Sequence, residues 1–169
     1  AETVLANLGL SSDFDLLTSN PLENLQAQKV NASLINIIAI GEGLLEGAGL
    51  SDSAGDELIV AQIVQILKTG TDISSAASIK SIIDTASAGL SDAIKTKVDA
   101  LSNNIAQSLA NTNAQINDAG SVSQIATYQK ATLDDTSSLL SSVISAVQSD
   151  SSTLEVVTAA SIETQAKAA

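Results

Sequence analysis

Two aspartates one residue apart, Asp13 and Asp15, are the first side chains whose spacing could support chemistry. Such a pair can place two carboxylates on one calcium ion, which prefers several oxygen ligands. The alternative is an Asx turn that separates two helices, with Phe14 and Leu16 turned inward. The loop lacks the further acids and the Gly of an EF-hand. We therefore favour the turn and keep Asp13 and Asp15 as candidate calcium ligands.

A second acidic group, Asp52, Asp56 and Glu57, lies where another helix is expected to begin. The helix dipole favours acids in the first turn, and we prefer this explanation to a metal site. Asp52 and Asp56 complete the set of candidate calcium ligands. Calcium is the one cofactor that the sequence suggests, because a di-metal bundle site would require a Glu-x-x-His motif and the chain has no His.

The side-chain inventory argues against catalysis. Cys and His are both absent, and all seven basic residues are Lys. A Ser-His-Asp triad is therefore excluded, and a Ser–Lys dyad would need a Lys buried beside a Ser. Phosphate-loop and dinucleotide patterns are also absent. The Gly pairs at 41–43 and 47–49 lack a preceding strand, so we interpret them as sites of close helix approach and helix fraying. We predict that the chain is not an enzyme.

The charge and hydrophobicity of the chain limit its partners. A net charge of −12 repels nucleic acid and anionic lipid. The longest apolar run, residues 34–45, is interrupted by Asn and Gly and is shorter than the roughly 20 residues of a membrane span. We expect neither a nucleic-acid partner nor a membrane-spanning helix. Because Met is absent, even at position 1, we expect a processed chain or a segment of a longer one.

Apolar residues recur at helical spacing between capping signals. Apolar side chains make up 44% of the chain but aromatic ones only 1%, so the core must consist of Leu, Ile, Val and Ala. Asn20, Pro21 and Glu23 form a strong helix-start signal. This helix should weaken near Gly41 and Gly43. The pattern predicts helices at about 3–8, 21–47, 54–69, 76–88, 91–119, 121–147 and 154–165.

The arrangement of these helices predicts an all-α fold. We expect a helical bundle with a long antiparallel helical hairpin, about 91–150, and shorter packing helices at about 3–89. Residues 1–169 form a single helical domain in this interpretation. A subdivision into a short-helix part, 1–89, and a long-hairpin part, 90–169, is compatible with the same pattern.

Three short stretches, LGL at 8–10, DLLTSNPL at 15–22 and QK at 28–29, carry a family resemblance. They resemble a segment of very large exported bacterial surface or adhesion proteins with cadherin-like or calcium-binding repeats. Those segments look like "LGL…DLxTxDPL…QK" followed by an Ala-rich helix, and the match covers about residues 4–45. The family's Asp before Pro is Asn20 here, which keeps the cap but weakens any cation role. The resemblance implies an extracellular or cell-surface location and no enzymatic activity.

These observations favour a non-enzymatic structural or interaction domain of an exported bacterial protein, acting as a spacer, an assembly surface or an adhesion module. Its partners would be other proteins or further copies of the chain, contacted through the long helices. The alternative is a helical binding module that holds a small apolar ligand between its helices.

Overall fold

The computed structural model describes residues 5, 8, 10, 20–51, 54–69, 72–134, 138–149 and 151–168. This part of the chain is helical throughout its regular structure and contains no strand, which confirms the all-α prediction. A short 3-10 turn, η1, precedes seven α-helices. The elements are η1 (Pro21–Glu23), α2 (Leu25–Gly47), α3 (Ala54–Thr69), α4 (Ala76–Ser87), α5 (Asp92–Asp118), α6 (Val122–Leu133), α7 (Leu139–Gln148) and α8 (Ala159–Ala168).

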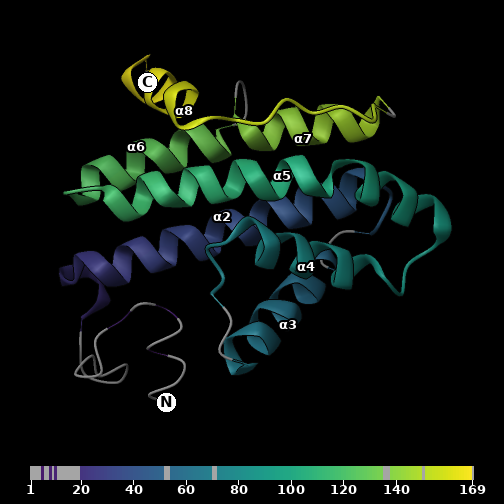
Figure 1. Ribbon diagram of the computed structural model, residues 1–169, viewed down its shortest axis with the longest axis horizontal. Helices are drawn as coiled ribbons and strands as arrows, with labels where there is room; N and C mark the ends of the chain where they lie inside the picture. Colours follow the sequence, from purple (N-terminus) through teal and green to yellow (C-terminus); the bar gives the residue numbers. More distant parts are fainter. Residues whose placement is uncertain are drawn as a thin grey trace.

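Helix α2 is the centre of the bundle. It packs against α3, α5, α6 and α7, and Figure 1 shows α2, α5 and the α6–α7 pair running along the long axis of the molecule. Helices α3 and α4 lie together at one side, with α4 packed against α5. The main core cluster contains only Leu, Ile, Val and Ala, as the composition predicts. Burial of each larger aliphatic side chain contributes about 1.5–3 kcal/mol to folding.

The start of α2 lies later than the sequence predicts. The Asn20 side chain accepts a hydrogen bond from the Leu22 amide, but this cap begins only the η1 turn. The N-cap of α2 is Asn24, whose Oδ1 accepts from the Ala27 amide at 3.0 Å. Two Asn caps in succession therefore divide the expected start into a turn and a helix.

Helix α2 continues without a break through Gly41 and Gly43, so the predicted weakening there is wrong. A Cβ at Gly41 would lie 2.7 Å from Ile59 of α3, and one at Gly43 would lie 2.7 Å from Leu140 of α7. The close helix approach that the sequence predicts therefore explains why Gly occupies these two positions. Packing on two sides offsets the helix-propensity cost of about 1 kcal/mol for each Gly.

The C-terminus of α2 is a Schellman motif. Gly49 has φ +111°, its amide bonds to the Glu46 carbonyl, and the Leu50 amide bonds to the Leu45 carbonyl. A left-handed residue at this position satisfies carbonyls that the helix leaves open, and Gly adopts it without a Cβ penalty.

The second arm of the predicted hairpin is two helices rather than one. Helix α6 ends at Leu133, Asp134 is extended, and Ser138 caps α7 by accepting from the Ser141 amide at 3.2 Å. The Ser138 hydroxyl also donates to the Asp134 carbonyl. Short polar side chains compete with helical hydrogen bonding, which explains the break. Both pieces pack more extensively on α2 than on α5.

Candidate functional site

The chain between α7 and α8 is extended rather than helical. The prediction of a helix from residue 154 is wrong for residues 154–158, because α8 begins only at Ala159. We call residues 151–158 the extended segment. In Figure 1 it returns over α7 toward α8. Its Thr, Val, Val and Thr are β-branched residues, which favour extended backbone.

Polar side chains of α5 hold the extended segment by its main chain. Asn104 Nδ2 donates to the Leu154 carbonyl at 2.7 Å, and Asn111 Nδ2 donates to the Val157 carbonyl at 2.8 Å. Ser108 Oγ accepts from the Val157 amide at 2.9 Å. We call Asn104, Ser108 and Asn111 the α5 clamp. A helix face therefore supplies the main-chain hydrogen bonds that a neighbouring strand would supply in a sheet.

The spacing of the clamp matches the rise of an extended chain. Asn104 and Asn111 are seven residues apart, which is about 10.5 Å along a helix. Leu154 and Val157 are three residues apart, which is about 10 Å along an extended chain. Because the two rises agree, each Asn side chain reaches one carbonyl of the extended segment. The clamp is thus built from a heptad spacing on α5.

A second layer of amides orients the clamp. Asn103 Nδ2 donates to Asn104 Oδ1 at 3.4 Å, and Gln107 Nε2 donates to Asn111 Oδ1 at 3.2 Å. Each inner amide is thereby held with its NH₂ group toward the extended segment. The Ser108 hydroxyl donates to the Asn104 carbonyl, which leaves its lone pair for the Val157 amide.

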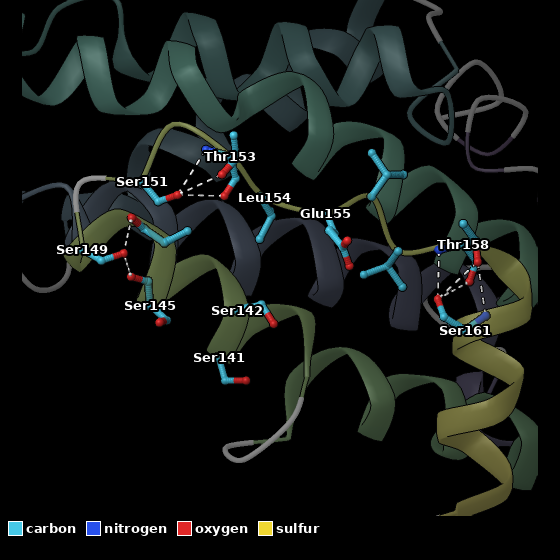
Figure 2. Close-up of a pocket in the computed structure, with 13 residues that line it drawn as sticks. Ser141, Ser142, Ser145, Ser149, Ser151, Thr153, Leu154, Glu155, Thr158 and Ser161 are labelled. Atoms are coloured by element: carbon cyan, nitrogen blue, oxygen red, sulfur yellow. Dashed lines mark hydrogen bonds between the residues drawn. The ribbon is translucent and has the colours of Figure 1, made fainter.

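A groove of about 1050 Å³ lies on the other side of the extended segment, between it and α7. We call it the polar groove. Figure 2 shows the extended segment along one wall and the Ser side chains of α7 along the other. Ser and Thr dominate its lining. The lining residues are Ser141, Ser142, Ser145, Ala146, Ser149, Ser151, Thr153, Leu154, Glu155, Val156, Val157, Thr158 and Ser161.

The chemistry of the polar groove is hydrogen bonding rather than proton transfer. Among the lining residues that the structure describes, Glu155 is the one that carries a charge, and its side chain is exposed. The hydroxyl groups of Ser141 and Ser149 donate to carbonyls one turn back along α7, which leaves their lone pairs as acceptors. Such a surface can accept amide protons along its length.

A buried pair of amides joins α2 to α5. Asn36 Nδ2 donates to Asn113 Oδ1 at 3.3 Å, and both residues are at most 2% exposed. Asn36 Oδ1 and Asn113 Nδ2, an acceptor and a donor, have no hydrogen-bond partner. A polar pair buried between two helices penalises other helix registers, since any shift would leave both amides unpaired.

Of the four candidate calcium ligands, Asp13, Asp15 and Asp52 lie outside the described residues. Asp56 is half-buried in the first turn of α3, where its Oδ1 accepts from the Glu57 amide at 2.7 Å. Within the described ranges, no group of three or more acidic, His or Cys residues could hold a metal ion. Calcium binding stays a prediction.

Lys29, Lys80 and Lys95 are among the described lysines that bond to carbonyl or carboxylate oxygens. Lys29 Nζ donates to the Asn117 carbonyl, and Lys80 pairs with Asp84 one turn further along α4. Lys95 pairs in the same way with Asp99, and this hydrogen bond raises the pKa of Lys95 above its ordinary value.

The prediction that the chain is not an enzyme stays a prediction.

No helix in the described part of the chain is both long and apolar enough to cross a membrane. Comparison with known proteins adds no family: no family, no curated protein and no solved structure matches this chain. These comparisons therefore assign no function to the chain.

Sequence reasoning did not single out the α5 clamp or the polar groove. The polar faces of the long helices were visible as Asn, Gln, Ser and Thr, but such faces ordinarily contact water. A usable signal is that four of the six residues from Thr153 to Thr158 are β-branched, which argues against a helix. Heptad-spaced amides on α5 would then have suggested what holds that run.

Proposed function

We propose that this chain is a non-catalytic structural domain of an exported bacterial protein, and that it works by contacting other protein chains. The observation that carries the proposal is the extended segment, clamped to α5 on one side and bordering an open polar groove on the other. In this proposal the contact surface is the polar groove beside α7. Contact through the long helices, which the sequence favours, stays a prediction.

The charge and composition of the chain support the same role. A net charge of −12 and a groove lined by hydroxyl groups suit reversible, hydrated contacts with protein. The resemblance of residues 4–45 to segments of large surface and adhesion proteins supports an exported setting. In such a setting the domain would serve in assembly or adhesion.

Light scattering on the isolated chain tests the proposal. We expect the weight-average mass to rise with concentration up to about 1 mM, which is the range of weak protein contacts. The rise should be reversible on dilution. A strict monomer across the whole range that also binds no second polypeptide would overturn the contact role and leave an inert spacer.

A second candidate function, binding of a small apolar ligand, is favoured by one hollow of about 390 Å³. Leu101 and Val147 form part of its wall, and Lys97, Ser151 and Ser152 also line it. A thermal melt with octanol as the probe tests this function, because a ligand that binds only the folded state raises its stability. An unchanged melting temperature at saturating octanol removes it.

A further inference from the structure

We infer that the polar groove binds a segment of another polypeptide in extended conformation, and that this segment is neutral or basic. The inference rests on the proposed function and specifies the partner. The bound segment lies between the extended segment and α7, with its main chain contacting both walls.

The molecule already contains one example of this recognition. The α5 clamp holds the extended segment by its main-chain carbonyl and amide groups, at distances of 2.7–2.9 Å. Contacts to main-chain groups do not depend on the side chains of the chain that is held. A helix face of small polar residues is therefore sufficient, in this fold, to hold an extended chain.

Helix α7 presents a comparable face to the polar groove. Ser141, Ser145 and Ser149 follow one another at four-residue steps, and all three line the groove. Each step advances about 6 Å along a helix, and two residues of an extended chain advance about 6.6 Å. Alternate residues of a bound segment can therefore meet successive hydroxyl groups. Ser145 Oγ makes no hydrogen bond within the described residues, so it is free to donate or accept.

The opposite wall offers unpaired main-chain groups. The carbonyls of Leu154 and Val157 both accept hydrogen bonds from α5, whereas the main-chain groups of the two residues between them do not. The amide and carbonyl groups of Glu155 and Val156 make no hydrogen bond in the part of the chain that the structure describes. Both residues line the groove. Unpaired main-chain groups on an extended chain are a template for pairing with a second chain.

Charge selects among extended segments. Glu155 is the one charged residue among the described residues that line the groove, and the whole chain carries −12. An acidic segment would be repelled by both, whereas a basic one is attracted to both. Charge thus favours a neutral or basic segment, and the Ser and Ala side chains of the facing wall leave room for its side chains.

A labelled peptide tests the inference. The probe is a fluorescein-labelled heptapeptide with the sequence of residues 152–158 carrying the Glu155→Lys change, because this sequence is already extended against a polar helix face. Fluorescence anisotropy should show saturable binding to the whole chain. The same peptide with Glu retained should bind about fivefold more weakly, the scale of one exposed charge contact. A version with N-methylated main-chain amides should not bind.

A groove-filling variant and its matched control locate the site. Ser145→Phe should weaken peptide binding by about tenfold or more, since the ring occupies the groove. Ser123→Phe, on the exposed surface of α6, should leave binding unchanged. Circular dichroism checks that both variants fold. If Ser145→Phe does not fold, the Val156 amide resonance of the unmodified chain should still shift on peptide addition.

Three results would overturn the inference: no saturable binding, equal binding of the N-methylated peptide, or equal affinity of the two Phe variants. If the peptide fails while the mass of the chain still rises with concentration, the inference falls and the proposed function stands. If the peptide binds as described while the chain stays monomeric, the groove is confirmed as a docking site and self-association is excluded.

Discussion

Removal of the α5 clamp should release the extended segment without unfolding the bundle. The triple variant Asn104→Ala, Ser108→Ala, Asn111→Ala deletes three hydrogen bonds to the main chain of the segment. Each is worth about 1 kcal/mol, so local stability should fall by about 3 kcal/mol. At about 1.4 kcal/mol per factor of ten, the equilibrium for local opening should rise about 150-fold. Ala favours helix more than Asn or Ser, so α5 itself should persist.

Hydrogen exchange measured by NMR reports this opening. The Val157 amide, which donates to Ser108 Oγ, should exchange about two orders of magnitude faster in the variant. The amide of Leu109, a fully buried residue of α5, should keep its exchange rate. Asn117→Ala is the matched control, because Asn117 is exposed on the same helix and its side chain contributes to no clamp bond.

Two outcomes would refute this account of the extended segment. An unchanged exchange rate at Val157 would mean that burial of Leu154, which is 9% exposed, holds the segment without the clamp. Equal acceleration at Val157 and Leu109 would mean that the segment and the bundle open together. Either outcome would show that the α5 amides do not act as a separate holding device.

Further predictions concern packing, the buried amides and calcium. Gly41→Ala should lower the free energy of unfolding by about 1–2 kcal/mol, because its methyl group would meet Ile59 at 2.7 Å. Gly89→Ala is the control: its methyl group would have no neighbour within 4 Å, so stability should be unchanged or slightly higher. Denaturant unfolding measures both variants. Asn36→Ala should lower the free energy of unfolding by about 2 kcal/mol, because it leaves the Asn113 amide buried without a partner. In a double-mutant cycle, the variant with both Asn36→Ala and Asn113→Ala should lose less stability than the sum of the two single variants. Additive costs would show that the two amides act independently. If the acidic loops bind calcium, the melting temperature should be higher in millimolar calcium than in chelator. An equal melting temperature under the two conditions would contradict calcium binding.

The sequence by itself determined the helical class, the composition of the core and most helix boundaries. Ser75, Ser91 and Ser121 stand at the N-caps of α4, α5 and α6, as their positions before apolar helical runs predict. Capping and 3.6-residue periodicity are properties of contiguous residues, so they can be recognised along the chain. With aromatic residues at 1%, an aliphatic core was the one solution available.

Only the tertiary structure decided how α2 crosses its glycines and how the extended segment is held. Gly41 and Gly43 stay helical because α3 and α7 pack against them, which no local propensity reports. The clamp joins residues 46 to 50 positions apart in the sequence. Side chains of α5 satisfy main-chain groups of Leu154 and Val157 in the extended segment, and this compensation exists only once α5 lies beside them. A helical pattern read locally over these residues therefore predicted the wrong backbone, and the polar groove could not be found before the fold was known.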